Sequence, residues 1–270
     1  MKIGLIAGAG QFPALFSKKA AKKGYQVYAV GFKGETDPAL TGCVKDLEWL
    51  YLGQVNRLIK YFKQHEITDV VMVGSIQKVN IFKDIRPDLK ALSFIAKTAR
   101  THDDSVLSRF ADLLLKDDIR ILASTFLLPE LLSPEGCWTK RRPDKAERKD
   151  IEQGWKIATE IGKLDIGQCI VISNGTVLAV EAIDGTDETI KRGGQLSHKN
   201  GAVVVKRSKP AQDLRFDLPA SGCRTIETMH RAGATVLVLE AGRSLSFDRE
   251  EMIALADKYR ISIVGYKESE

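Results

Sequence analysis

A short segment late in the chain, residues 206–225, gathers side chains that could act on an anionic substrate together with a metal ion. If residues 213–218 form a strand, Asp213, Arg215 and Asp217 point to one face while their apolar neighbours point to the other. Residues four apart on a regular strand are roughly 13 Å apart, so the two carboxylates share one ion only if the strand bends. We therefore expect one of the two carboxylates to act directly in the reaction and the other to have an orienting role.

Basic residues and the start of a helix surround these carboxylates. Lys206 and Lys209 precede them, and Gly222 and Thr225 fall where the next helix is expected to begin. Cations and the free N–H groups of a helix N-terminus together suit a phosphate. A ladder of surface ion pairs, worth roughly 0 to 1 kcal/mol per pair, explains the Asp-Arg-Asp pattern equally well.

Two glycines near the start of the chain suggest another binding surface. Gly8 and Gly10 lie between an expected strand and an expected helix, and Gln11 begins that helix. A dinucleotide fingerprint is incomplete here, because Pro13 stands where a third glycine is needed and the second strand does not end in an acidic residue. The pattern argues against NAD and leaves two alternatives: a helix N-terminus that holds a phosphate, or simply a tight turn.

Polar residues also follow two other expected strands. Gly74 and Ser75 end a presumed parallel strand, where ligands bind in open α/β sheets, although a polar connector would look the same. Glu181 ends an otherwise apolar strand, and Thr186 and Asp187 open the helix that follows. Helix capping accounts for Thr186 but not for Glu181, so we expect this group to contribute to substrate binding.

The composition narrows the class of protein. With 270 residues, 44% of them hydrophobic and 28% charged, the chain is sized for one large or two medium globular domains. No stretch reaches the roughly 18 consecutive apolar residues of a membrane span, which favours a cytoplasmic protein. The four cysteines lack Cys-x-x-Cys spacing, so neither a zinc site nor a disulfide framework is indicated. A net charge of +6 favours anionic partners.

Alternating strands and helices predict an α/β fold. In the first half, short apolar runs such as residues 2–7 and 69–73 alternate with helical patterns, which indicates a parallel sheet covered by helices. Periodicity fails between residues 134 and 149, where basic residues accumulate, so we expect a linker there. The predicted organisation is a Rossmann-like N-terminal domain at 1–133, a linker at 134–149 and a second α/β, catalytic domain at 150–270.

The second half of the chain has its own local signals. Asn174-Gly175 predicts a hairpin, because both positions tolerate positive φ. Helices are expected from about residue 149 to 163 and from near Thr186, Gly222 and Asp248, the last through a capping box with Glu251.

Several segments, taken in order along nearly the whole chain, resemble the LpxI-type UDP-2,3-diacylglucosamine pyrophosphatases of lipid A biosynthesis. The segments that carry the resemblance are Gly4–Gly10, Gly53-Gln54, Val70–Gly74, Arg86–Leu89, Leu127–Leu132, Asp165–Gln168, Val177–Ala182, Gly185–Asp187 and Lys209–Pro219. Each is weak alone, and the combination is specific.

The resemblance implies an activity and a set of partners. It implies Mg²⁺-dependent hydrolysis of UDP-2,3-diacylglucosamine to UMP and 2,3-diacylglucosamine 1-phosphate, in a cleft between two domains. The essential aspartate of the family falls in Gln212–Pro219, and we assign it to Asp213, also as the metal ligand, with Asp217 second. The amphipathic nucleotide-sugar lipid further implies a cytoplasmic protein with transient, peripheral contact with the inner membrane. A homodimer is expected on base rates alone.

The residues are consistent with this chemistry, and alternatives remain. A diphosphate repels nucleophiles, so an enzyme must neutralise charge and align water. We expect Asp213 to bind the metal or orient the water, Asp217 to support it, and Lys206, Lys209 or Arg215 to screen phosphate oxygens. The alternatives are another nucleotide-sugar enzyme, such as a transferase or epimerase, and a non-enzymatic module that binds nucleic acid. No nucleic-acid-binding motif is visible, so we expect no nucleic-acid partner.

Overall fold

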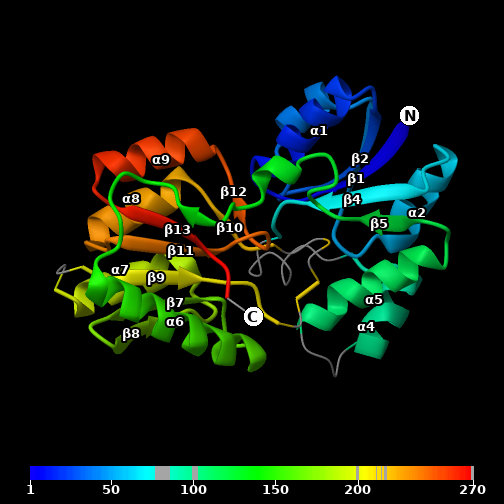
Figure 1. Cartoon of the computed structure of the whole chain (residues 1–270). Coiled ribbons are helices and arrows are strands. Elements are labelled where there is room, and N and C mark those ends of the chain that lie inside the picture. The colour runs from blue at the N-terminus through cyan, green and yellow to red at the C-terminus, as the bar shows by residue number, and fades with distance from the viewer. Residues whose placement is uncertain are drawn as a thin grey trace. The chain divides into compact units, whose positions relative to one another are not determined.

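The computed structural model describes residues 1–76, 86–98, 103–198, 201–210, 212–213, 215 and 218–268, with only the backbone at 95–98 and 103–106. The chain divides into two compact units (Figure 1). Unit 1 comprises Met1–Pro129 and Asp213–Asp217, and unit 2 comprises Glu130–Gln212 and Leu218–Glu270. The short segment that carries Asp213 therefore belongs to unit 1, although the residues on both sides of it belong to unit 2.

Unit 1 contains a five-stranded, all-parallel sheet in the order β3-β2-β1-β4-β5. Its strands are β1 (Lys2–Ala7), β2 (Gln26–Phe32), β3 (Asp46–Leu50), β4 (Asp69–Val73) and β5 (Arg120–Leu122). Sequence order runs outward from β1 in one direction through β2 and β3 and in the other through β4 and β5. The adjacent carboxyl ends of β1 and β4 are therefore the point where ligands bind in sheets of this kind.

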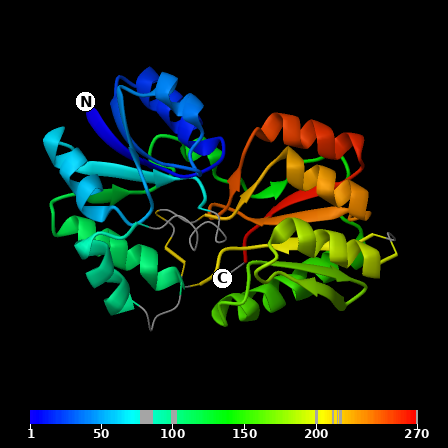
Figure 2. The same cartoon turned by 180° about the vertical axis from the view of Figure 1, so that it is seen from behind.

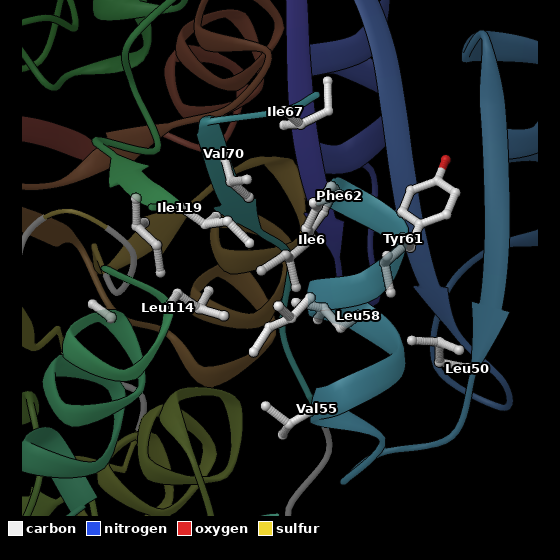
Figure 3. Close-up of a cluster of buried hydrophobic side chains, with 14 of the residues drawn as sticks. Ile6, Leu50, Val55, Leu58, Tyr61, Phe62, Ile67, Val70, Leu114 and Ile119 are labelled. Carbon is white, nitrogen blue, oxygen red and sulfur yellow. The ribbon is translucent and has the colours of Figure 1, made fainter. Parts of the chain in front are cut away.

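Helices cover both faces of this sheet (Figure 1). Helix α1 (Phe12–Lys22) lies on one face, and α2 (Val55–Gln64), α4 (Leu89–Thr98) and α5 (Asp103–Leu115) lie on the other. Figure 3 shows the core beneath α2 and α5, where Ile6 and Val70 from the sheet meet Leu58, Phe62 and Leu114 from the helices. The continuous apolar strands follow from this two-sided burial.

Unit 2 contains a six-stranded mixed sheet in the order β6-β13-β11-β9-β7-β8. Its strands are β6 (Gly136–Cys137), β7 (Cys169–Ser173), β8 (Thr176–Val180), β9 (Val203–Lys206), β11 (Val236–Glu240) and β13 (Ser262–Tyr266). The three central strands β9, β11 and β13 are parallel, and the flanking strands run antiparallel to their neighbours. A separate two-stranded sheet pairs β10 (Ala220–Ser221) with β12 (Leu245–Ser246). The predicted fold class, a Rossmann-like domain followed by a second α/β domain, is confirmed.

Helices cover both faces of the mixed sheet (Figure 2), and a cluster of buried apolar side chains lies on each face. Helix α6 (Lys145–Lys163) packs its buried Trp155 on one face. Helices α7 (Thr186–Leu196), α8 (Cys223–Ala232) and α9 (Arg249–Lys258) cover the other. The predicted hairpin joins β7 and β8, with φ of 49° at Asn174 and 75° at Gly175. Positive φ at both positions gives the turn the twist of its flanking strands.

Helix α6 begins inside the stretch 134–149, for which the sequence suggested a linker. Asp144 is its N-cap: the Asp144 side chain accepts hydrogen bonds from the backbone N–H groups of Ala146 and Glu147, while the Glu147 side chain accepts from the Asp144 N–H. This is a complete capping box, which stabilises the first turn of a helix. Strand β6 also lies in this stretch.

Other sequence-based assignments were wrong. Asp213 and Arg215 do not lie in a strand, and Arg215 is in a turn. The Asp213 carboxylate accepts a hydrogen bond from the Arg215 N–H at 3.0 Å, a local bond that folds the chain back. At α9, Asp248 is the N-cap residue as expected, but its φ is 47° and its side chain makes no capping hydrogen bond, so the predicted capping box is not formed. Strand β3 and helix α4 were not predicted at all.

Candidate functional site

The principal candidate residue, Asp213, forms a close ion pair within unit 1. Its two carboxylate oxygens accept hydrogen bonds from the Arg215 side chain, from Nη2 at 2.6 Å and from Nε at 3.0 and 3.1 Å. The Ser108 hydroxyl of α5 donates to the same carboxylate at 3.2 Å. The Asp213 side chain is 17% exposed and that of Arg215 is 43% exposed. The carboxylate therefore has a defined orientation and a remaining path to solvent.

The surroundings of Asp213 favour its charged form. The Arg215 side-chain hydrogen bonds lower the pKa of Asp213 below its ordinary value, against a smaller opposing effect of burial, and Ser108 acts in the same direction as Arg215. The Ser124 N–H, just beyond β5, donates to the Arg215 carbonyl oxygen, which attaches the segment to the sheet edge. The Ser124 hydroxyl is buried and has no hydrogen-bond partner within the described part of the chain.

The described side chains do not fit a Mg²⁺ site made by the protein alone. Among the residues that the structure describes, no group of three or more His, Cys, Asp or Glu side chains could hold a metal ion. Both oxygens of Asp213 already accept hydrogen bonds from Arg215. Asp217, the second expected carboxylate, lies outside the described residues.

The predicted binding residues at the start of the chain do meet at the sheet edge of unit 1. Ala9 and Ser75 exchange backbone hydrogen bonds of 2.7 and 3.2 Å, so the segments after β1 and β4 lie side by side. A Cβ atom on Gly8 would lie 2.5 Å from the Ser75 carbonyl oxygen. Gly74 has a φ of 94°, and a Cβ there would lie 2.7 Å from the Ala9 carbonyl oxygen. Both glycines are therefore required by this close approach.

The remaining two residues of this group lie at the start of α1. Gly10 has a φ of 91°, and Gln11 is the N-cap residue of the helix. The Gln11 side chain makes no capping hydrogen bond. The N-terminus of α1 thus lies a few residues after the end of β1, as the sequence suggested.

A second set of predicted residues comes together in unit 2, at the carboxyl edge of its sheet. Asp187, Thr186, Lys206 and Thr225 line one cavity there. Thr186 does not cap α7: the N-cap is Gly185, and the Thr186 hydroxyl donates to Glu181 Oε1 at 3.0 Å. The capping explanation of Thr186 was therefore wrong, and Glu181 is its hydrogen-bond acceptor.

Two other predicted residues of unit 2 lie away from this cavity. The Lys209 ammonium forms an ion pair with Asp165, and Gly222 is the N-cap of α8. Neither Lys209 nor Gly222 lines the cavity described above.

Sequence reasoning missed two residues near Asp213. Ser108 and Ser124 contact the Asp213–Arg215 pair. In unit 2, Arg224 lies in the Gly222–Thr225 stretch that was expected to begin a helix and to supply cations, and it forms an ion pair with Asp187 at 2.7 Å. Ser108 lies 105 positions from Asp213 and carries no local signal.

Fold and site together define a two-unit α/β protein with polar side chains at the carboxyl edges of both sheets, a class whose members bind ligands at those edges. Residues 2–131 match the LpxI N-terminal domain, and residues 134–264 match the LpxI C-terminal domain. The chain belongs to the LpxI family.

A curated relative agrees with these family matches. The UDP-2,3-diacylglucosamine pyrophosphatase LpxI of Caulobacter vibrioides is 33% identical over 275 aligned positions, which cover 98% of this chain and 97% of the relative. The similarity thus extends over essentially the full length of both proteins.

Solved structures give only weak likenesses. A biotin carboxylase from Campylobacter jejuni aligns with a TM-score of 0.30 and 12% identity, covering 72% of this chain and 42% of that one. The biotin carboxylase domain of the 2-oxoglutarate carboxylase from Hydrogenobacter thermophilus aligns with a TM-score of 0.29 and 11% identity. That alignment covers 73% of this chain and 41% of the other. Scores at this level carry no argument for fold or function.

Within the described ranges, no helix combines the length and the apolar character needed to cross a bilayer.

Proposed function

We propose that this protein hydrolyses the pyrophosphate bond of UDP-2,3-diacylglucosamine, giving UMP and 2,3-diacylglucosamine 1-phosphate in lipid A biosynthesis. The observation that carries the proposal is the full-length similarity to the Caulobacter pyrophosphatase, at 33% identity. Support from the site comes from Asp213, whose carboxylate is oriented by Arg215 and Ser108.

The chemistry asks for an oriented water and neutralised phosphates. A water oxygen forms a bond to one phosphorus, the bridging P–O bond breaks, its electron pair leaves with the other phosphate, and the water gives up a proton. A carboxylate with a lowered pKa stays charged at neutral pH, so Asp213 is suited to accept a hydrogen bond from the water and align it. The Arg215 guanidinium, less buried than the carboxylate, is suited to screen phosphate oxygens.

The Mg²⁺ requirement is a further proposal. Mg²⁺ is usually held by one or two carboxylates together with substrate phosphates, so a site with few protein ligands is compatible with an ion that arrives on the diphosphate. We expect EDTA to abolish hydrolysis and Mg²⁺ to restore it, while Mg²⁺ alone gives no binding signal in calorimetry with the substrate-free protein. Tight calorimetric binding of Mg²⁺ without substrate would contradict this view.

The cellular setting is proposed on the chemistry of the substrate. A lipid-linked substrate resides in a membrane, so we propose a cytoplasmic protein in transient, peripheral contact with the inner membrane, acting as a homodimer and without a nucleic-acid partner. Sedimentation with vesicles that carry the substrate tests the contact, and sedimentation equilibrium tests the dimer.

The main experiment compares the wild-type protein with Asp213→Asn. We expect turnover of UDP-2,3-diacylglucosamine in the presence of Mg²⁺ to fall by about 100-fold or more, because an amide cannot offer a charged acceptor to the water. UMP release, followed by chromatography, gives the rate. Asp118→Asn is the matched control, because Asp118 is an exposed aspartate of unit 1. Asp213→Asn turnover close to the wild-type rate would remove the site assignment.

The rival activities are separated in the same assay. A transferase needs a second acceptor and an epimerase releases no UMP, so UMP formation with water as sole acceptor excludes both. Performing the reaction in ¹⁸O-labelled water adds the position of attack, since the label enters whichever phosphate received the water.

A further inference from the structure

A cavity of about 380 Å³ lies at the carboxyl edge of the sheet in unit 2. Its size is within the range of roughly 300 to 1,000 Å³ that is typical of small-ligand sites. Residues 184–188, at the start of α7, form one part of its wall. Lys206 from β9 and Ala220, Arg224 and Thr225 from β10 and α8 complete it.

The acidic residues that line this cavity are each neutralised by a cation of their own. The ion pairs are Asp184 with Arg192, Asp187 with Arg224 and Glu188 with Lys191. The lining carboxylates are therefore not arranged as free ligands for a cation.

Lys206 is the exception to this balance. It is only 6% exposed, and its Nζ donates one hydrogen bond, to the Ala220 carbonyl oxygen at 2.6 Å. Across the described residues no ion pair joins Lys206 to a carboxylate, Glu181 included. A buried ammonium without a counter-ion is costly, and within the described part of the chain only one of its three N–H donors has an acceptor. Both facts point to an anion as the missing partner.

Two helices present their N-terminal ends at the same cavity. Gly185 and Gly222 are the N-cap residues of α7 and α8, and neither glycine supplies a side-chain cap. In the described structure, the backbone N–H groups of residues 186–188 have no acceptor. Such groups carry partial positive charge and bind phosphate well.

We propose that this cavity binds the phosphate group of a nucleotide or sugar phosphate, with Lys206 as counter-ion and the first turn of α7 supplying N–H donors. The proposal rests on the proposed function, whose two products, UMP and a sugar 1-phosphate, both carry such a group.

The test is an NMR titration of the amide-labelled full chain with inorganic phosphate, UMP and glucosamine 1-phosphate in separate arms. We expect the largest amide shifts at residues 186–188. The arm with the tighter binding identifies the product whose phosphate is held. Absence of shifts at α7 with all three ligands at millimolar concentration overturns the proposal, as do shifts confined to other residues.

A pair of variants tests the role of the ammonium. Lys206→Met keeps the length and the burial of the side chain but removes its charge, so binding is expected to weaken by about tenfold or more. Lys258→Met makes the same change at an exposed lysine near the opposite edge of the sheet, and we expect unchanged affinity. Equal affinity in Lys206→Met and wild type overturns the proposal; if that variant does not fold, the wild-type shifts decide.

These titrations measure ligand binding and do not depend on turnover of the UDP-sugar. A protein that binds phosphate at α7 but does not hydrolyse the UDP-sugar would refute the proposed function and leave this site standing, and the reverse result would refute only the site.

Discussion

The Asp213 carboxylate is held by partners that differ in sequence distance. Arg215 is two positions away, and Ser108 is 105 positions away on α5. Holding a reacting group to within a fraction of an ångström is worth large factors in rate, so the weaker contact from Ser108 is expected to matter. We propose a positioning role for Ser108, because its hydroxyl donates to the Asp213 carboxylate.

Ser108→Ala tests this positioning role. We expect kcat to fall by about three- to tenfold with little change in KM, because one hydrogen bond of roughly 1 kcal/mol is lost from the reacting group and none from substrate binding. Ser93→Ala, at an exposed serine of α4, is the control. A change in KM with unchanged kcat would instead place Ser108 in substrate binding.

Three segments of unit 1 meet at one acidic side chain, and the stability of the unit should therefore depend on pH. Asp117, just after α5, forms ion pairs with Lys63 of α2, at 2.8 Å, and with Lys90 of α4. Hydrogen bonds from these two lysines lower the pKa of Asp117 below 3.8. A lowered pKa means that the pairs stabilise the folded state above about pH 4, and that this contribution is lost as the pH falls through the folded-state pKa.

Asp117→Asn should therefore cost roughly 0.2 to 1 kcal/mol of unfolding free energy at pH 7, a small value because the lysines are partly exposed. The difference from wild type should narrow as the pH drops below 4, where the wild-type carboxylate is also neutral. Urea unfolding at several pH values measures it, with Asp118→Asn as the control. A difference that grows in acid would contradict the assigned ion pairs.

The junction after β1 and β4 depends on the small size of Gly8. Gly8→Ala places a methyl group 2.5 Å from a carbonyl oxygen, so we expect a loss of about 1 to 3 kcal/mol in unfolding free energy. Gly42→Ala is the matched control, because a Cβ atom there meets nothing within 4 Å. Equal stability of the two variants in urea unfolding would show that the backbone at Gly8 moves away at little cost.

Elements with local signals could be predicted from the sequence, and those without could not. Strands β1 and β4 were assigned with their observed bounds, and the Asn174-Gly175 turn was correct, because apolar runs and positive-φ residues act over a few positions. The start of α6 was missed although Asp144 and Glu147 have capping-box spacing, because the basic residues around them suggested a linker. Strand β3 was missed because its residues 46–49 are exposed or only half-buried.

The sequence indicated candidate site residues but not how they group in space. Asp213 and Arg215 were expected on one face of a strand, and they contact each other through a turn instead. Their interaction with Ser108 depends on α5, which no pattern near residue 213 could indicate. In unit 2, Lys206 and Thr186 do line one cavity, because strand and helix ends fall on the same sheet edge.

At the scale of the whole molecule, the two units have separate hydrophobic cores. The core in Figure 3 includes Leu114 of unit 1, whereas unit 2 has its own clusters on both faces of its sheet. Separate cores favour separate unfolding transitions, and the tryptophans divide accordingly, with Trp49 in unit 1 and Trp138 and Trp155 in unit 2.

Leu114→Ala tests this separation. Because Leu114 is fully buried, its truncation should lower the unfolding free energy of unit 1 by about 2 to 5 kcal/mol. In variants that keep only Trp49 or only Trp155, we expect the urea midpoint reported by Trp49 to fall more than the one reported by Trp155. Equal shifts of both midpoints would mean that the units unfold as one cooperative structure.

The assignment of residues 213–217 to unit 1 has a consequence for recombination between relatives. A chimera that joins the first half of one family member to the second half of another would combine Ser108 from one parent with Asp213 from the other. The Asp213 carboxylate would then meet a foreign surface, even though each parental half was inherited intact. Productive hybrids should be those in which this five-residue stretch is exchanged together with the first half of the gene.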